Sequence, residues 1–112
     1  MVDRFDAELG ILAPRKATIE ELALVHEASY LTAVTEDYLC DEWSGHRGDL
    51  AQLAQTFAGG TLVALDALLD GSTLTAIHLP GAKHHAQHDH ASGFCVFADF
   101  AIAAKIAVAK GL

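Results

Sequence analysis

Two adjacent histidines, His84 and His85, carry the strongest chemical signal in the chain. They lie in the stretch from Pro80 to Asp99, PGAKHHAQHDHASGFCVFAD, which separates two apolar segments. Imidazole exchanges protons near pH 7, so a doublet facing one pocket could activate a water molecule and protonate a leaving group. The alternative is that both are exposed loop histidines, as we expect for His88 and His90.

The same loop also offers donors for a metal ion. Five nitrogen or oxygen donors occur within seven residues: His84, His85, His88, Asp89 and His90. Imidazole and carboxylate groups suit zinc and related metals. Small residues and the Ser92-Gly93 pair argue against a helix that would gather these donors on one face. A dedicated metal-binding loop therefore ranks below a proton-transfer site.

Helices are predicted on both sides of this loop. Thr18 and Glu21 form a capping-box pattern that predicts a short helix through about His26. Ser29 is a candidate cap for a second short helix. Apolar spacing predicts the longest helix from Asp49 to Gly71, and Asp99 is a candidate cap for a helix to about Lys110. The inward positions of the second helix are Leu31, Val34, Tyr38 and Leu39.

Two further patterns set the expected fold class. Thr73 to Leu79, TLTAIHL, is β-prone and bounded by glycine and proline, which predicts a buried strand leading into the histidine loop. Gly59-Gly60 inside the long helix indicates either close backbone packing or a simple kink. Helices around a strand indicate the α/β class, with a mostly helical chain and one visible strand.

Composition limits the other classes of function. The 112 residues, 52% of them hydrophobic, suit one domain over residues 1–112. A net charge of -8 without a basic stripe argues against nucleic acid and anionic membranes as partners. Two cysteines, Cys40 and Cys95, indicate a reducing compartment, and the acidic start does not resemble a leader peptide. We therefore expect a cytoplasmic protein.

Several motifs together resemble the histone deacetylase superfamily, in particular its acetoin-utilisation and acetylpolyamine amidohydrolase branch. They are GAKHHA, followed by ASGFCVF, and, upstream, APRKATIEELALVHEASYLTAV and FAGGTLVAL. The resemblance covers roughly residues 9 to 108, with the motifs in the family's order. It implies part of the arginase/deacetylase-like three-layer α/β fold, mostly helical here with a small remnant of the parallel sheet.

The resemblance also implies roles for individual residues. His84 and His85 would be the tandem general base and general acid beside a zinc-bound water, acting on acetylated lysine or an acetylated polyamine. Gly93 and Phe94 would line the narrow tunnel for the acyl-lysine stem. Cys95 would lie near the pocket, where a small buried apolar residue is the simpler interpretation. Asp99 would match the aspartate of an Asn-Asp pair whose Asn is replaced by Ala98.

Departures from the family pattern limit the expected activity. The family's Asp-x-His zinc ligands do not occur in this sequence. The chain resembles an amino-terminal segment of the enzyme, truncated at both ends, so we expect no stably bound zinc, no metal site and no efficient turnover. The alternative is a non-catalytic homo-oligomeric interaction module on the same scaffold, because an unpaired strand at Thr73 to Leu79 favours association with another copy.

Overall fold

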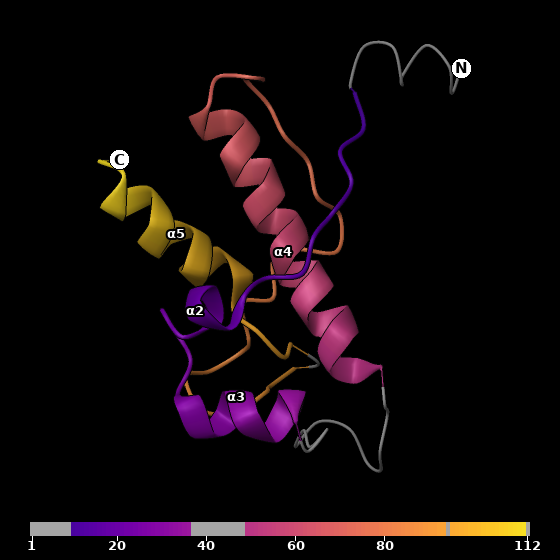
Figure 1. The fold of residues 1–112 in the computed structure, drawn as a ribbon, viewed down its shortest axis with the longest axis vertical. Helices are drawn as coiled ribbons and strands as arrows, with labels where there is room; N and C mark the ends of the chain where they lie inside the picture. The colour runs from indigo at the N-terminus through magenta and orange to yellow at the C-terminus, as the bar shows by residue number, and fades with distance from the viewer. Residues whose placement is uncertain (1–9, 37–48, 94, 112) are drawn as a thin grey trace.

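The structure, a computed structural model, describes residues 10–36, 49–93 and 95–111. Its helices follow in the order α2 (Ile19–Leu22), α3 (Ala28–Thr35), α4 (Leu50–Leu69) and α5 (Asp99–Ala109). α4 is the axis of the arrangement, with α5 beside it and α3 near its first turns (Figure 1). None of these described helices is both long enough and apolar enough to cross a bilayer.

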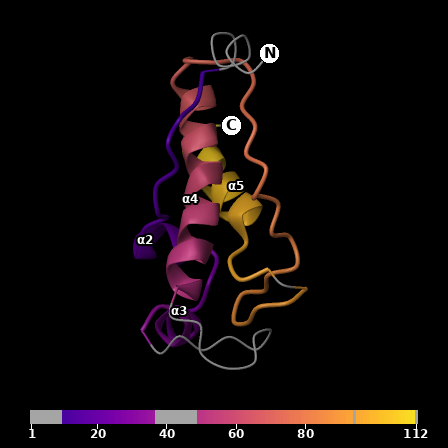
Figure 2. The ribbon, with the colours of Figure 1, turned by 90° about the vertical axis from the view of Figure 1, so that its right-hand side faces the viewer.

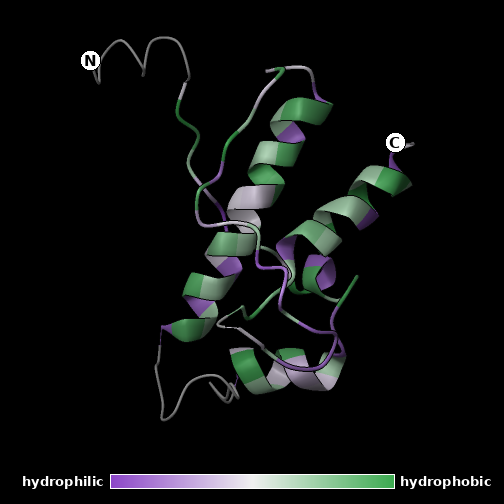
Figure 3. Cartoon of the chain, turned by 180° about the vertical axis from the view of Figure 1, so that it is seen from behind, coloured by the Kyte–Doolittle hydropathy of each residue, from purple (hydrophilic) through white to green (hydrophobic). Residues whose placement is uncertain are grey.

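α4 confirms the helix predicted from residue 49 to residue 71. Its apolar residues recur on the face toward α3 and α5, and the chain leaves the helical conformation at Gly71, whose φ is +81°. Apolar residues also cover much of the remaining surface of α4 and α5 (Figure 3).

The Gly59-Gly60 pair allows two other segments to lie directly against α4. A Cβ atom on Gly59 would be 2.7 Å from the amide nitrogen of Ala17 and closer still to the carbonyl oxygen of Arg15. A Cβ atom on Gly60 would be 2.5 Å from Nε2 of His78. Close backbone packing, one of the two predicted explanations, is therefore confirmed. It offsets a helix-propensity cost of about 1 kcal/mol for each glycine.

The core lies between α4, α5, the N-terminal helices and the residues just before α5. Burying each large side chain contributes about 1.5–3 kcal/mol. The largest fully buried apolar side chains are Phe97, Leu22, Leu62, Ile102 and Val34.

The first of the N-terminal helices is shorter than predicted. The Thr18 hydroxyl accepts a hydrogen bond from the Glu21 amide, and the Glu21 carboxylate accepts one from the Thr18 amide, so the capping box is confirmed. α2 nevertheless ends at Leu22, and turns continue to His26. Hydrogen bonds from the Arg15 guanidinium lower the pKa of Glu21 to about 2 and hold α2 against the preceding segment.

α3 starts one residue before the predicted cap. Glu27 occupies the N-cap position and Ser29 lies inside the helix, where its hydroxyl donates a hydrogen bond to the Glu27 carboxylate. Leu31 and Val34 are buried as predicted. The other two predicted inward residues, Tyr38 and Leu39, lie outside the described residues, as does Cys40.

The strand predicted over Thr73 to Leu79 is not found. This segment is extended but pairs with no other segment, and the described residues contain no strand, only an isolated bridge between Ser92 and Cys95. A strand needs a neighbour for its backbone hydrogen bonds, and the described chain places none beside residues 73–79. The mostly helical character is therefore confirmed, whereas the parallel sheet is not observed in the described part of the chain.

Candidate functional site

His84 and His85 lie together at the surface of the loop between residue 79 and α5. Their ring centroids are 4.2 Å apart with an interplanar angle of 43°, and both side chains are exposed. Nδ1 of His84 lies 3.0 Å from the carbonyl oxygen of Ala82, so this nitrogen carries the proton in the neutral tautomer that the contact favours. Nε2 of His84 is then the basic nitrogen.

Gly93 packs directly on the ring of His85. It has a φ of +52°, and a Cβ atom on it would lie 2.8 Å from Cγ of His85 and 2.9 Å from Cδ2. A side chain at position 93 would therefore displace the ring. The structure thus brings together the predicted proton-transfer histidine and one of the two predicted tunnel residues. The other, Phe94, lies outside the described residues.

A buried carboxylate anchors the chain just before the two histidines. Asp99, the first residue of α5, is fully buried. Its Oδ2 accepts hydrogen bonds from the Ala82 amide at 2.9 Å and the Thr61 hydroxyl at 2.5 Å, and its Oδ1 accepts one from the Lys83 amide at 2.7 Å. Asp99 therefore connects α4, α5 and the histidine loop. Ala98, rather than Asp99, occupies the N-cap position of α5.

Gly81 is required where the loop passes this carboxylate. A Cβ atom on Gly81 would lie 2.9 Å from both Oδ2 of Asp99 and Oγ1 of Thr61. Such a contact is shorter than a side chain can adopt without moving the loop. The glycine three residues before His84 therefore has a steric reason: only a bare backbone fits over the Asp99 carboxylate.

A buried histidine, His26, anchors the far side of the loop. Its Nε2 accepts a hydrogen bond from the Ala98 amide at 2.9 Å, and its Nδ1 lies 3.2 Å from the carbonyl oxygen of His88. These partners require Nδ1 to carry the proton. Burial lowers the pKa of His26 below its ordinary value of 6.5, so the neutral ring is favoured. The side chain is 2% exposed.

Tyr30, in the first turn of α3, adds a second contact to this anchor. Its hydroxyl donates a hydrogen bond to the carbonyl oxygen of Val96 at 2.6 Å. The rings of His26, Tyr30 and Phe97 contact one another with centroid separations of 5.4–6.1 Å. His26, in the bend before α3, and Tyr30, in the first turn of α3, therefore both bond to the segment that connects Gly93 to α5.

The sequence interpretation did not assign roles to His26, Tyr30, Thr61 or Asp99 as positioning residues. No local signal marked the first two, because His26 precedes α3 and its partner Ala98 is 72 positions away, while Tyr30 bonds to Val96, 66 positions away. No local signal distinguishes Thr61 from other polar helix residues, since its partner Asp99 is 38 positions away.

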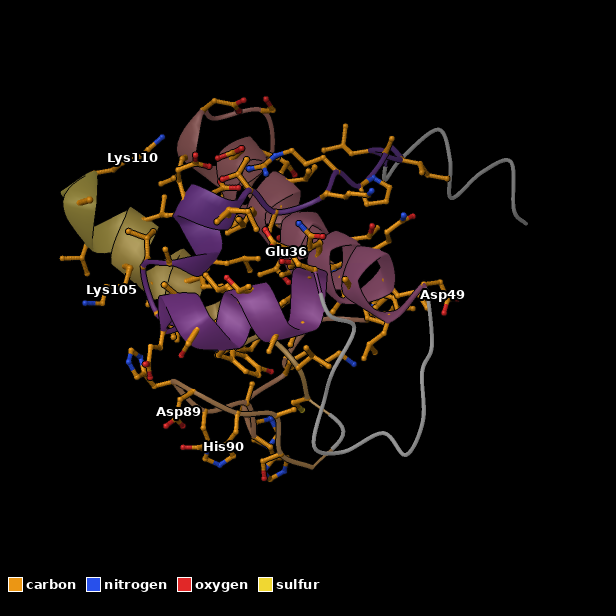
Figure 4. All side chains as sticks on the ribbon, turned by 60° about the horizontal axis from the view of Figure 1, so that its bottom comes forward. Glu36, Asp49, Asp89, His90, Lys105 and Lys110 are labelled. Carbon is orange, nitrogen blue, oxygen red and sulfur yellow. The ribbon has the colours of Figure 1, made fainter. Side chains whose placement is uncertain are left out.

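His88 and His90 are exposed, as predicted. Nδ1 of His88 lies 2.6 Å from the carbonyl oxygen of Val25, and the Glu27 amide donates to the carbonyl oxygen of His88, so this part of the loop is tied to the N-terminal segment. His90 pairs with Asp89 at 2.7 Å on the outside of the loop (Figure 4). That pairing lowers the pKa of Asp89.

The donor set does not fit a metal ion. Among the described residues, no three histidine, cysteine, aspartate or glutamate side chains converge on one point. His88 is turned toward Val25, and Cys95 is buried with Ala86 and Ala98 in a small apolar cluster. Imidazoles with a free nitrogen can nevertheless take up and release protons without a metal, and the loop holds His84 and His85 in place for that.

Comparisons with known proteins agree with the motifs. The sequence profile of the histone deacetylase domain matches residues 2–112. The acetoin utilization protein AcuC of Bacillus subtilis (strain 168) is 37% identical over 115 aligned positions, covering 91% of this chain and 30% of that protein. AcuC of Staphylococcus aureus (strain COL) is 37% identical, covering 85% of this chain and 28% of that protein.

A eukaryotic protein is similar at nearly the same level. Histone deacetylase 8 of Xenopus tropicalis is 34% identical over 109 aligned positions, covering 82% of this chain and 28% of that protein. The chain thus spans less than a third of the length of each of these three relatives.

Proposed function

The chain belongs to the histone deacetylase family, and from this membership we propose that it is the tandem-histidine segment of a deacetylase site. In this proposal His84 and His85 are the general base and general acid in the hydrolysis of an acetylated lysine or acetylated amine to amine and acetate. Gly93 and Phe94 form part of the wall beside the acyl chain. The contact between Gly93 and His85 is the observation that carries the proposal, because it joins the two predicted functions at one place.

The proposed roles follow from the surroundings of the two rings. His84 keeps Nε2 free for a proton if Nδ1 donates to Ala82, and His85 lies 4.2 Å away, close enough to stabilise charge that develops on its neighbour or on the substrate. Asp99 and His26 are positioning residues in this scheme. They act on the two ends of the loop through backbone groups and do not touch the rings of His84 or His85.

Zinc supplies the water activation in the family that the motifs resemble, but the described residues do not fit that ion. We therefore propose that the chain alone does not turn over efficiently. We also propose a cytoplasmic protein that does not bind nucleic acid, which the net charge of -8 supports.

The test is a chimera in which this chain replaces the matching segment of the Xenopus tropicalis histone deacetylase 8. We expect the chimera to hydrolyse an acetyl-lysine amide, and His84→Ala or His85→Ala to lower kcat by about 10²–10⁴-fold. His90→Ala, which alters an exposed histidine of the same loop, should leave kcat unchanged. A folded chimera without activity, or one insensitive to both substitutions, would refute the proposed role.

A second function is favoured by an observation away from the histidines. Leu74, Ile77 and Leu79 are 98%, 74% and 91% exposed. Three large apolar side chains so close together usually indicate an interaction surface. We propose that the chain is also able to act as a non-catalytic module that associates with its own copies. Measuring the mass of the chain in solution tests this second function without reference to catalysis.

A further inference from the structure

A groove of about 510 Å³ runs along α4, and its lining includes neither His84 nor His85. Its floor is the middle and end of α4, and its two walls are extended segments on either side of that helix (Figure 2). One wall consists of residues 10–14 and the other of residues 72–78. The α4 residues that line the floor are Gly60, Val63, Ala64 and Ala67.

The second wall has the properties of a strand without a neighbour. In the described part of the chain, none of the amide groups of residues 76–79 donates a hydrogen bond. The segment is held instead by side chains, because Nε2 of His78 bonds to the carbonyl oxygen of Phe57 at 2.8 Å and the ring lies on Gly60. The amide groups of residues 76–79 are therefore available for pairing, whereas the Thr73 amide donates to the carbonyl oxygen of Ala67 and the Thr75 amide donates to the Thr73 hydroxyl.

Both faces of this segment are suited to burial. Ala76 and His78 face α4 and are half-buried, whereas Ile77 and Leu79 point away from it and are exposed. This alternation of burial is that of a strand covered on one side, whereas large apolar side chains on the uncovered face are typical of a strand covered on both. The opposite wall adds two more exposed apolar side chains, Ile11 and Leu12.

We propose that this groove accepts the Thr73–Leu79 segment of a second copy of the chain, in a reciprocal exchange. This inference locates the surface of the proposed self-association. Each copy offers both parts of the interaction: a vacant position between two extended walls, and an extended apolar segment whose amide groups at residues 76–79 are free. A two-fold axis that runs parallel to the two Thr73–Leu79 segments, and between them, fills the groove of each copy with the segment of the other. No groove is then left open, so the assembly stops at two copies.

The resulting dimer has a defined arrangement. The two Thr73–Leu79 segments lie parallel and adjacent, each flanked on its outer side by residues 10–14 of the other copy. The two α4 helices then lie on opposite faces of this four-segment sheet. Ile77 and Leu79, which point away from their own α4, are covered by the α4 of the partner.

Charge supports a second copy as the occupant. Residues 10–14 and 72–79 contain no Lys, Arg, Asp or Glu, although the chain as a whole has a net charge of -8. The only titratable side chain in the two walls is His78, whose Nε2 is already bonded within its own copy. Two copies can therefore approach through this surface without placing like charges against each other.

Light scattering of the whole chain at micromolar concentration tests the proposal. We expect twice the mass of one chain for the wild type and the mass of one chain for Ile77→Lys, because the lysine would have to be buried under the partner's helix. Val108→Lys is the matched control, since Val108 is 68% exposed on α5 and outside the groove. It should remain dimeric. Circular dichroism should show the same helix content in all three proteins.

The outcomes separate the groove from the other proposals. A monomeric wild type would overturn both the self-association and the assignment of the groove as its contact surface. The occupant of the groove would then be a strand from another polypeptide segment. If Ile77→Lys were still dimeric, the groove could not be the contact surface, although the self-association itself would stand. The His84→Ala, His85→Ala double variant should dimerise like the wild type, so a failure of the deacetylase proposal does not affect this test.

A second measurement does not depend on any variant. Pairing of the extended segments occurs only in the dimer, so the infrared β-sheet band of the wild-type chain should grow with concentration in step with the dimer fraction. A dimer that forms without any gain in this band would overturn the strand exchange.

Discussion

Gly93 holds the His85 ring in place by having no side chain. The substitution Gly93→Ala adds a methyl group 2.8 Å from Cγ of His85 at a φ of +52°. The left-handed backbone alone costs about 1 kcal/mol for alanine, and the contact with the ring adds to it. We expect a loss of about 2 kcal/mol or more in the free energy of unfolding. Urea denaturation measures it, and the NMR signals of the His85 ring should shift.

Gly71→Ala is the matched control for this prediction. Gly71 has a φ of +81°, but a Cβ atom there would meet nothing within 4 Å. Its substitution therefore carries only the backbone cost of about 1 kcal/mol. Equal losses for the two alanine variants, with an unshifted His85 signal, would show that Gly93 does not position the ring.

His26 makes stability depend on pH. Its folded-state pKa lies below 6.5, so as the pH falls below about 6.5 the unfolded chain takes up a proton before the folded chain does. His26 therefore destabilises the fold progressively from that pH down to its folded-state pKa, by at most about 1.4 kcal/mol per pH unit. Urea unfolding at a series of pH values from about 7.5 to about 4.5 should show this loss.

His26→Phe isolates that contribution. The variant leaves the Ala98 amide without its acceptor, so we expect it to be less stable than the wild type at neutral pH by about 1–3 kcal/mol. Its stability should also fall less steeply than that of the wild type as the pH drops. A slope unchanged in His26→Phe would contradict the assignment of the buried neutral ring.

Sequence reasoning could identify the chemically active residues but not what holds them. His84 and His85 stand out because a histidine doublet is unusual, and Gly93 followed from the family motif. The residues that hold these side chains in place could not be identified in the same way. His26 reaches Ala98 across 72 positions and Tyr30 reaches Val96 across 66. Contacts over such separations leave no local pattern, so only the folded chain shows them.

At the scale of elements, Asp99 is the joint between α4, α5 and the histidine loop. Asp99→Asn keeps the shape of the side chain but replaces one acceptor oxygen by an NH₂ group. At least one of the three donors from Thr61, Ala82 and Lys83 then loses its partner. We expect a loss of about 1–3 kcal/mol in the free energy of unfolding, measured by urea denaturation, with shifted NMR signals for the loop histidines.

Asp70→Asn is the control for Asp99→Asn. Asp70 is an exposed carboxylate that accepts hydrogen bonds from the backbone and side chain of Ser72. The same chemical change at this position should alter stability far less and leave the loop histidines unaffected. Similar losses in the two variants would argue against Asp99 as the joint.

The elements themselves were predictable to different degrees. α4 could be predicted because its apolar spacing and its glycine stop are local in sequence. The segment from Thr73 to Leu79 has the composition of a strand, yet a strand also requires a neighbour, and sequence composition does not say whether one is present. The end of α2 was predicted about four residues too late, and the start of α3 was missed because Glu27 rather than Ser29 takes the N-cap position.

At the scale of the whole molecule, two surfaces have different chemistry. The loop with His84 and His85 is polar and is held by Asp99 and His26. The groove along α4 is apolar and uncharged, and its walls have free backbone groups. Belonging to the histone deacetylase family accounts for the first surface, through the motifs that match it. For the second surface, the described residues provide no backbone partner to the amide groups of residues 76–79.

The net charge of -8 predicts how self-association responds to salt. Two such copies repel each other over the Debye length, which is about 10 Å at 0.1 M salt and about 3 Å at 1 M. The proposed contact surface is uncharged, so salt weakens the repulsion without weakening the attraction. The dimer Kd should therefore fall several-fold when sodium chloride is raised from about 0.02 M to about 0.5 M. Light scattering across a dilution series measures this change. If the Kd rose with salt instead, ion pairs would have to hold the copies together, and the uncharged groove could not be the surface that joins them.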